Sequence, residues 1–302
     1  MISIVRRPEL YSDELAAVRA LVDAVAVADG TAAYSEPVML DLAASEPPAD
    51  TSHLLAHDDG VLVAYAHVDA STPDDLVVEA AVRPEHRRRG IGTAVADQVA
   101  AELPSARAWA HGDQPGAARL AERIGLRRAR ELWQMRRPPA AGPLPELVVP
   151  GGVEIRPIRV GVDEEAIVAV NNRAFAWHPE QSGWTVAAVA AIEAEHWFDA
   201  DGVLLAWDTG DGGALLGFHW TKVHEHSASV PEPLGEVYVV GVDPAAQGRR
   251  LGSALTLAGL HRLAAKGLDT VILYVEGDNA AAIATYCRLG FEQSAVDVSY
   301  QR

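Results

Sequence analysis

The stretch GVDPAAQGRRLG at residues 241–252 decides the fold, because a similar stretch, AVRPEHRRRGIG, occupies residues 81–92. In each copy a run with strand character reaches a proline and a basic, glycine-containing turn, and an apolar helix pattern follows. This order is typical of a βαβ-like crossover, which places the turn at a helix N-terminus. Each stretch therefore predicts an anion-binding turn, since a helix N-terminus exposes unpaired N–H groups and a partial positive charge.

The two halves of the chain resemble each other beyond this turn. WAHGDQ at residues 109–114 and YVEGDN at residues 274–279 each precede a predicted helix, at nearly the same distance from the turn. Residues 138–152 contain five prolines and three glycines, so neither a helix nor an interior strand runs through them. We predict the α/β class, with a mixed α+β sheet, in two tandem domains over residues 1–140 and 153–302, joined by a linker at 141–152.

The periodicity of the second half predicts a definite order of elements. The expected elements are a strand at Gly235–Val242, a helix at Ser253–Ala265, a strand at Val271–Val275, a helix at Ala280–Leu289 and a closing strand near Ser294–Tyr300. In the first half, the corresponding helix after the turn is expected at Thr93–Ala101. Each half also opens with a short strand and an acidic helix start.

Composition narrows the class of protein. The chain has 302 residues, 49% of them hydrophobic, which is ample for two packed cores. Its formal net charge of -17 disfavours nucleic acid and anionic membranes as partners. A single cysteine, Cys287, excludes an intramolecular disulfide, and we expect its side chain to be a buried apolar one. With no apolar run of about 20 residues and no signal-peptide pattern, a monomeric cytoplasmic protein is expected.

The turns match the coenzyme motif Arg/Gln-x-x-Gly-x-Gly/Ala, and the chain accordingly resembles the GNAT acetyltransferase superfamily. RRRGIG at residues 87–92 matches fully, whereas QGRRLG at residues 247–252 has Arg250 where the first glycine belongs. The resemblance implies that backbone amides of both turns hold the pyrophosphate of acetyl-coenzyme A. The coenzyme-binding residues that it implies are Ala80, Ala81, Val82, Arg88, Arg89, Gly90, Ile91, Gly92 and Thr93 in the first half, and Val240, Gly241, Val242, Gln247, Gly248, Arg249, Arg250, Leu251, Gly252, Ser253, Asn279, Ala280, Ala281, Ala282, Ile283 and Ala284 in the second.

Arg250 leaves two conformations of the second turn open. The turn can be remodelled around Gly248, so that Arg249 or Arg250 contacts a phosphate. Alternatively, the backbone keeps its usual path with a positive φ at Arg250, and the side chain projects outward. We expect the second conformation, because Gln247 and Gly252 keep their places.

Longer segments resemble the mycothiol synthase family of tandem GNAT proteins. They are WAHG at 109–112, QMRRP at 134–138, AWHPEQSGW at 176–184, GFHWTKV at 217–223 and GEVYVVGVDP at 235–244. The resemblance implies acetyl transfer from acetyl-coenzyme A to the cysteine amine of cysteinyl-glucosaminyl-inositol, the last step of mycothiol biosynthesis. Two rival functions stay open on the sequence: acetylation of another amine, and non-catalytic sensing of an acyl-coenzyme A.

The expected chemistry falls in the second half. Alternation along the strand puts Glu236, Tyr238 and Val240 on one face, so that the Glu236 carboxylate can accept a proton from the acceptor ammonium. The family resemblance implies that Tyr286 is the acid that protonates the coenzyme A thiolate. The first half has Ala121 at the place of this tyrosine and Leu76 or Val77 at the place of Glu236, so it is expected to hold coenzyme without catalysis.

The same resemblance implies an acceptor site that draws on both halves. It places Glu36, Glu180, Lys222, Glu236 and Tyr274 there, and Glu36 implies an acceptor held between the domains. Three histidines, His219, His224 and His226, would be aligned on a strand, but none has a carboxylate or cysteine partner at a metal-ligand spacing. No metal is therefore expected.

Overall fold

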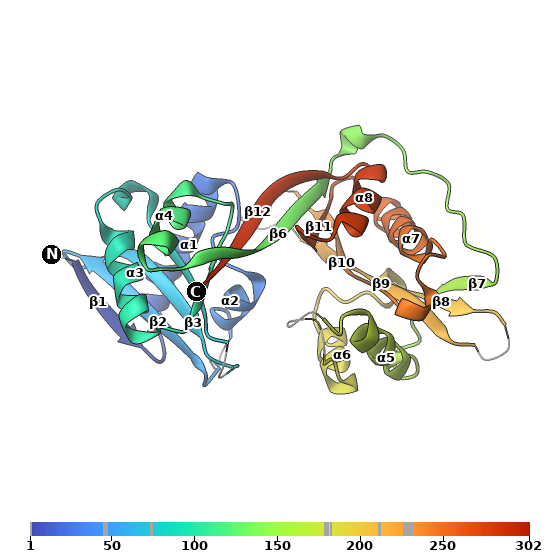
Figure 1. Ribbon diagram of the computed structural model, residues 1–302, viewed down its shortest axis with the longest axis horizontal. Helices are drawn as coiled ribbons and strands as arrows, with labels where there is room; N and C mark the ends of the chain where they lie inside the picture. The colour runs from blue at the N-terminus through green and yellow to red at the C-terminus, as the bar shows by residue number, and fades with distance from the viewer. Residues whose placement is uncertain are drawn as a thin grey trace. The chain divides into compact units, whose positions relative to one another are not determined.

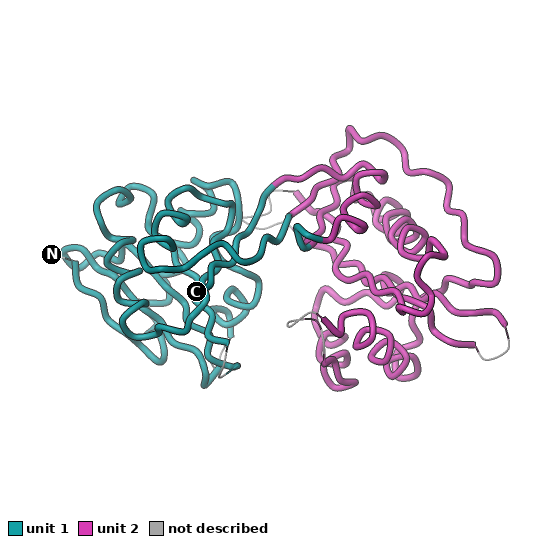
Figure 2. Tube along the Cα trace, viewed as in Figure 1, with its two compact units in different colours: residues 1–133, 276–278, 295–302 teal, residues 134–275, 279–294 magenta. Residues whose placement is uncertain are grey.

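A computed structural model describes residues 2–44, 48–72, 75–177, 181, 183–210, 213–225 and 232–302. The chain forms two compact units, shown in different colours in Figure 2. Unit 1 comprises residues 1–133, 276–278 and 295–302, and unit 2 comprises residues 134–275 and 279–294. Among the described residues, no helix is long and apolar enough to cross a membrane.

Unit 1 is a sheet covered by helices on both faces (Figure 1). Its strands follow in the order β1 (Ile2–Arg7), β2 (Thr51–Asp58), β3 (Val61–Asp69), β4 (Val77–Val82), β5 (Arg107–Ala110) and β12 (Glu292–Gln301). Helices α1 (Ser12–Asp29) and α2 (Glu36–Asp41) pack on one face, against Leu55 and Tyr65. Helix α3 (Ile91–Glu102) packs on the other face and contacts α4 (Pro115–Arg123).

Unit 2 repeats this plan. Its strands follow in the order β6 (Arg127–Arg137), β11 (Val271–Glu276), β10 (Leu234–Val242), β9 (Leu215–His224), β8 (Val203–Asp208) and β7 (Val153–Pro157). Helices α5 (Glu164–Ala174) and α6 (Val186–Glu193) cover the face that carries Phe218 and Trp220. Helix α7 (Leu251–Ala265) covers the opposite face, and α8 (Ala280–Arg288) follows β11. The order of elements expected from the sequence is confirmed in this unit.

The boundaries of the two compact units differ from the domain boundaries expected from the sequence. The main difference is the unit to which the last strand belongs. Residues 295–302 belong to unit 1, where Val298 is paired with Ala110 and Tyr300 with Ala108. The last four residues of β6 belong in turn to unit 2. The strands that end the two halves, β6 and β12, are therefore each divided between the two units. The repeats in the sequence do not predict how these strands are divided, because the division depends on pairing between strands far apart in the chain.

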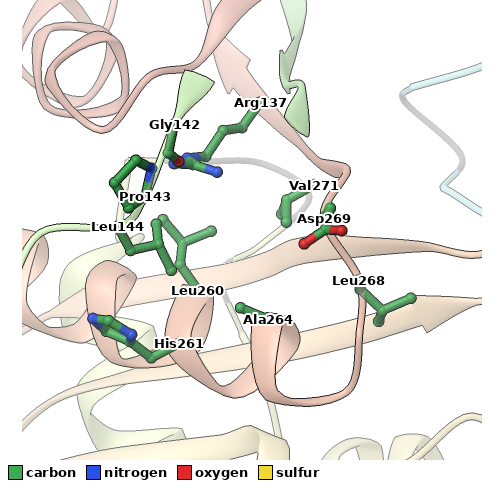
Figure 3. A pocket seen from close by; sticks show the side chains of 10 residues that line it. All are labelled: Arg137, Gly142, Pro143, Leu144, Leu260, His261, Ala264, Leu268, Asp269 and Val271. Carbon is green, nitrogen blue, oxygen red and sulfur yellow. The ribbon is translucent and has the colours of Figure 1, made fainter. Parts of the chain in front are cut away.

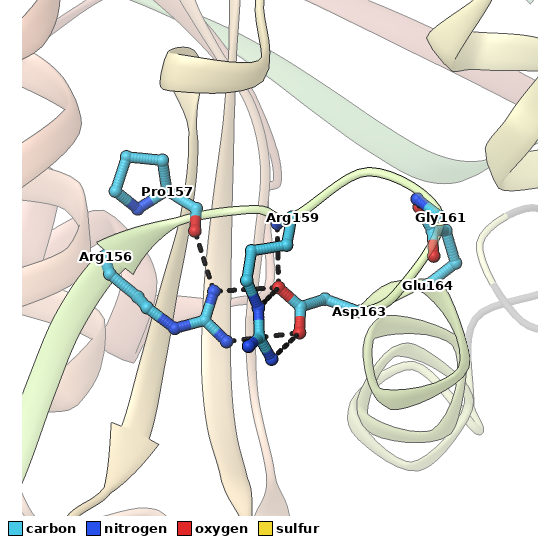
Figure 4. A network of polar contacts seen from close by, with 6 residues as sticks. All are labelled: Arg156, Pro157, Arg159, Gly161, Asp163 and Glu164. Atoms are coloured by element: carbon cyan, nitrogen blue, oxygen red, sulfur yellow. Dashed lines mark hydrogen bonds and ion pairs between the residues drawn. The ribbon is translucent and has the colours of Figure 1, made fainter.

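The start of α5 is fixed by a buried ion-pair network, shown in Figure 4. The Asp163 carboxylate accepts hydrogen bonds from the Arg156 guanidinium at 2.8 and 3.1 Å and from the Arg159 backbone N–H at 2.8 Å. Burial alone would raise the pKa of Asp163, but the hydrogen bonds from Arg156 and Arg159 outweigh it and hold the pKa well below its usual range. The acidic helix start seen in the sequence thus anchors α5 to the end of β7.

Candidate functional site

In both units the central parallel strand pair separates after three residues. β4 is in register with β5 only from Val77 to Glu79, and β10 is in register with β11 only from Gly235 to Val237. Beyond these points β4 and β10 remain paired with their antiparallel neighbours β3 and β9. One backbone edge of residues 80–82 and of residues 240–242 therefore faces the opening between the separating strands. These are the strand residues predicted to bind the coenzyme.

The two turns that follow have the same backbone path. In unit 1 the residues with positive φ are Arg88 (63°) and Gly90 (84°), and in unit 2 they are Gly248 (80°) and Arg250 (64°). Both turns thus have two left-handed positions. Unit 1 has arginine at the first and glycine at the second, whereas unit 2 has glycine at the first and arginine at the second. The positive φ expected at Arg250 is present, and Gly248 does not remodel the turn.

Each turn opens a helix whose first N–H groups have no intrahelical partner. The first helical hydrogen bonds run from Ala94 N–H to the Gly90 carbonyl and from Ala254 N–H to the Arg250 carbonyl. Neither N-cap has a capping side chain. The first-turn amides belong to the predicted coenzyme residues Ile91, Gly92 and Thr93 in unit 1, and Leu251, Gly252 and Ser253 in unit 2. Such amides are suited to a pyrophosphate.

The arginines of the turns divide into structural ones and ones available to a ligand. Arg87 binds both Asp29 oxygens, at 2.6 and 2.8 Å, and the Val82 carbonyl, so that it ties the turn to α1. Arg89 pairs with Asp58 at 2.8 Å. In the described part of the chain, neither Arg88 nor Arg250 has a hydrogen bond or an ion pair. These two side chains are therefore the turn arginines that no described protein group engages.

Asn279, another predicted coenzyme residue, caps α8. Its Oδ1 accepts a hydrogen bond from the Ala282 N–H at 3.1 Å. This bond fixes the first turn of α8, which contains the predicted residues from Ala280 onward, at the end of β11 and its short connecting turn. The helix therefore begins on the side where β10 and β11 separate.

Glu236 lies in the last paired stretch of β10, just before the strands separate. Its side chain is buried, with 5% of its surface exposed. Its register partners are Lys222 on β9 and Ile272 on β11. Its Oε2 lies 2.6 Å from Nε2 of His224, a contact that the sequence analysis missed. The sequence signal was present, because His224 lies two residues beyond Lys222 and therefore on the same face.

Lys222 is buried on the face that carries Glu236. Its ammonium lies 4.4 Å from the ring centroid of Trp197 and 5.2 Å from that of Tyr238. Only 4% of Lys222 is exposed, and the two rings pack against each other at a centroid distance of 5.2 Å. Positive charge over aromatic faces next to a carboxylate forms a polar, aromatic-lined patch suited to a small polar ligand.

A β-bulge in β10 interrupts the alternation of side chains between the two faces that the sequence predicted. The register with β9 shifts between Val237 and Val239, so that Val240 is paired with His219. His219 faces α7, where its Nδ1 lies 2.8 Å from the Leu255 carbonyl. Glu236 and Tyr238 share the α5 face as expected, but Val240 lies on the opposite one. The expected alignment of His219 with His224 is wrong because the two residues are five apart on β9 and therefore lie on opposite faces. His226 lies outside the described residues.

The two tyrosines occupy different elements. Tyr274 lies two residues beyond Ile272 on β11, hence on the face of Glu236, and its hydroxyl accepts a hydrogen bond from Gln134 at 3.0 Å. Tyr286 lies on α8 with its ring 5.9 Å from that of Phe291. Burial raises the pKa of Tyr286 to about 12, so that the hydroxyl keeps its proton at neutral pH. Among the described residues, no hydrogen bond joins Tyr286 to Glu236.

Unit 1 carries ionisable groups where the sequence indicated none. Glu79, at the last paired position of β4, binds His111 Nε2 at 2.9 Å, and His111 Nδ1 lies 2.9 Å from Asp297 of β12. Burial would lower the pKa of His111, but Asp297 and Glu79 outweigh it and raise the pKa to about 10. The expectation of a chemically empty first half is therefore wrong for these groups, although the Glu79 carboxylate is engaged by an imidazolium. His111 belongs to the WAHG segment already singled out in the sequence.

Three further residues complete the comparison with the sequence. Glu36 is exposed at the first position of α2. Glu180 lies outside the described residues. Cys287 is exposed and not buried as expected, because its position on α8 faces away from the sheet-side residue Tyr286.

A shallow pocket elsewhere in unit 2 lies on the other face of the sheet from Glu236. Figure 3 shows it between α7 and the segment after β6. Its lining residues Leu260, Leu268 and Val271 belong to the α7 side of the sheet, opposite Glu236. Its arginine, Arg137, donates to the carbonyls of Leu289 and Gly142 and is therefore structural.

Comparison with known proteins places this geometry in a family. The acetyltransferase (GNAT) family model matches residues 19–126 and 170–291, one region in each half. A mycothiol acetyltransferase of Nocardia farcinica is 54% identical over 286 residues, which cover 94% of this chain and 92% of that protein. Another, of Salinispora tropica, is 49% identical and covers 99% of this chain and 96% of its own.

The chain belongs to the mycothiol acetyltransferase family. Membership makes it an acetyltransferase with two GNAT domains and confirms the family resemblance found in the sequence. Solved structures share the fold. A GCN5-related N-acetyltransferase from Sphaerobacter thermophilus has a TM-score of 0.75 at 24% identity, over 99% of this chain and 95% of that one. A tandem GNAT protein from the clavulanic acid biosynthesis pathway has a TM-score of 0.73 at 19% identity, over 100% and 98%.

Proposed function

We propose that the protein transfers the acetyl group of acetyl-coenzyme A to the cysteine amine of cysteinyl-glucosaminyl-inositol, and so completes mycothiol. The observation that carries this proposal is the place of Glu236, buried on the ligand-facing side of β10 just before β10 and β11 separate. The neighbouring edge at residues 240–242 and the first turn of α7 are suited to the pantetheine arm and the pyrophosphate. A carboxylate in this position is next to the expected path of the thioester.

The reaction needs a neutral amine, a polarised thioester and a proton for the departing thiolate. Glu236 takes a proton from the acceptor ammonium, so that an N–H bond breaks and a carboxyl O–H bond forms. The neutral amine then attacks the thioester carbonyl. Tyr286, whose phenol is protonated at neutral pH, donates its proton to the coenzyme A sulfur as the C–S bond breaks. The second proton lost by the attacking nitrogen then restores the phenol. Burial that disfavours the phenolate also disfavours a bare thiolate, which helps this proton transfer.

The two units divide the work. Unit 1 has the complete glycine motif, but its strand carboxylate Glu79 is held by His111 and by both Ser35 donors, the N–H at 2.7 Å and the hydroxyl at 2.6 Å. A carboxylate held by an imidazolium and two further donors is a poor base. We infer that unit 1 binds acetyl-coenzyme A structurally and that unit 2 carries out the transfer.

We assign recognition of the acceptor to polar side chains on one face of the unit 2 sheet. The acceptor carries an ammonium and many hydroxyls, which favour carboxylates and aromatic faces as ligands. Glu236, Lys222 and Tyr274 share one face of the unit 2 sheet and fit this requirement. Glu36 and Glu180 remain predictions that rest on the family resemblance.

The proposal is tested by incubating the purified protein with acetyl-coenzyme A and cysteinyl-glucosaminyl-inositol and identifying the product by mass spectrometry. The expected product is the amide, which keeps a free thiol that reacts with an alkylating agent. Only a thioester product, with the thiol blocked, or no product at all would contradict the assignment. Spermidine and a peptide amine serve as comparison acceptors.

A further inference from the structure

The carboxylate of Glu236 has one hydrogen-bonding side chain among the described residues, and that side chain is His224. The two atoms, Glu236 Oε2 and His224 Nε2, are 2.6 Å apart. His224 ends β9, two residues beyond Lys222, whose register partner is Glu236. The contact is therefore a diagonal cross-strand pair on the ligand-facing side of the sheet.

The chemistry of the two groups fixes the direction of this hydrogen bond. An ionised carboxylate only accepts hydrogen bonds, so Nε2 of His224 must carry the proton that lies between the two atoms. Such a charge-assisted bond is among the stronger ones in proteins. It also restrains the carboxylate plane through one oxygen, which leaves the other oxygen to take the proton of the amine.

The other groups that face Glu236 do not replace this contact. From β9, the Lys222 ammonium sits over the rings of Trp197 and Tyr238. From β11, the facing residues are Ile272 and the phenol Tyr274, which is bonded to Gln134. The helices packed on this face, α5 and α6, contribute the apolar side chains of Ile167, Val170 and Val189 to the core.

We propose that His224 is the positioning residue of the general base: its Nε2–H orients the Glu236 carboxylate for proton transfer. The inference rests on the proposed role of Glu236 in acetyl transfer. The histidine is 26% exposed, so its ring lies at the boundary between the site and solvent. Its role is to orient and not to react, since the proton of the amine passes to Glu236.

The test compares His224→Ala, His224→Gln and His261→Ala. Glutamine supplies an amide N–H at about the reach of Nε2 and is the conservative variant. His261, on α7, is a matched control, because its Nε2 makes a single hydrogen bond, to the Pro145 carbonyl at 2.9 Å. The measurements are kcat and KM for both substrates, together with the carboxylate carbon NMR signal of Glu236 at neutral pH in glutamate-labelled protein.

His224→Ala should lower kcat by roughly 10–100-fold, the effect of a lost hydrogen bond to a charged group, with the KM of acetyl-coenzyme A unchanged. The carboxylate NMR signal of Glu236 should move from its wild-type position, because a hydrogen-bond donor has been removed. His224→Gln should recover most of the activity and the wild-type signal. His261→Ala should match the wild type in every measurement.

Two results would overturn the inference. One is a His224→Ala variant with wild-type kcat and an unmoved carboxylate NMR signal of Glu236. The other is a glutamine variant as impaired as the alanine variant. A wild-type protein that fails to acetylate the acceptor would contradict the proposed function instead. The NMR signal of Glu236 still decides the His224 inference in that case, because it needs no turnover.

Discussion

Arg250 and Gly90 occupy the same position of the two coenzyme turns, and both have left-handed backbone conformations, with φ of 64° and 84°. A non-glycine residue in this region carries a conformational cost of order 1–3 kcal/mol. The turn of unit 2 therefore keeps its ligand-binding path without the glycine that favours it. The cost is tolerated because the turn is held by β10 before it and by α7 after it.

Replacing Arg250 by glycine should relieve this cost. We expect Arg250→Gly to bind acetyl-coenzyme A at least as well as the wild type, measured by calorimetry, and to unfold at an equal or higher temperature. The reverse change in unit 1, Gly90→Arg, should lower the unfolding temperature, since a side chain at a φ of 84° is strained even though a Cβ there meets nothing within 4 Å. A loss of tenfold or more in coenzyme affinity for Arg250→Gly, about 1.4 kcal/mol, would mean that the guanidinium itself binds a phosphate.

Glu236→Gln should keep coenzyme binding and lose most of the turnover. A general base typically contributes about 10²–10⁴-fold in rate, and an amide cannot accept the ammonium proton. The measurement is kcat near neutral pH beside the calorimetric affinity for acetyl-coenzyme A. Glu225→Gln, at an exposed glutamate that follows His224, is the control and should behave as the wild type. Turnover within a few-fold of the wild type across the pH profile would remove Glu236 from the mechanism.

The His111 ion pairs should make the stability of unit 1 depend on alkaline pH. Because the folded-state pKa of His111 is raised to about 10, its contribution is fully present below about 6.5, its usual value, and is lost as the pH rises through about 10. His111→Gln breaks buried pairs with Glu79 and Asp297, which typically costs about 3–5 kcal/mol. Urea unfolding should show this difference from the wild type at pH 7 and a smaller one at pH 10.5.

The control for this experiment is His57→Gln, on β2 of the same unit. Its difference from the wild type should be small and should not depend on pH. A His111→Gln difference that stays constant from pH 7 to pH 10.5 would contradict the charged state assigned to His111.

Deleting residues 295–302 should destabilise unit 1, although these residues end the second half of the sequence. They carry Val298 and Tyr300, buried to 0% and 4% exposure against Ala121 and Leu126 of unit 1. The deletion also removes Asp297 from His111. Hydrogen exchange of β5 should accelerate strongly, whereas removal of Arg302 alone should leave it unchanged. Unaltered protection of β5 in the deletion variant would show that β12 is not needed by unit 1.

Local patterns in the sequence were sufficient for most of the fold. The strand at β10, the turn at residues 247–252 and helix α7 follow from hydrophobic periodicity, proline and glycine placement within about 30 residues. The division of β6 and β12 between the two units was not predictable in this way, because it depends on pairing between strands far apart in the chain. The bulge at Val237 was missed for a related reason: no single residue marks it, and it reverses the face of every residue that follows.

The candidate site was only partly predictable. Glu236 and Lys222 were named from the sequence, and the register places them opposite each other. Their partners were missed, since His224 and the ring of Trp197 reach the site through cross-strand and tertiary packing. Glu79 was missed because the alignment of the two halves compared it with an apolar residue of β10.

Acceptor selectivity tests the central claim most directly. The measurement is kcat/KM for cysteinyl-glucosaminyl-inositol beside spermidine and a peptide amine, under the same acetyl-coenzyme A concentration. A site that hydrogen bonds the sugar and inositol hydroxyls should favour the cysteinyl substrate by about 10²-fold or more. Equal kcat/KM values for the three amines, or a preference for either comparison amine, would contradict the proposed function.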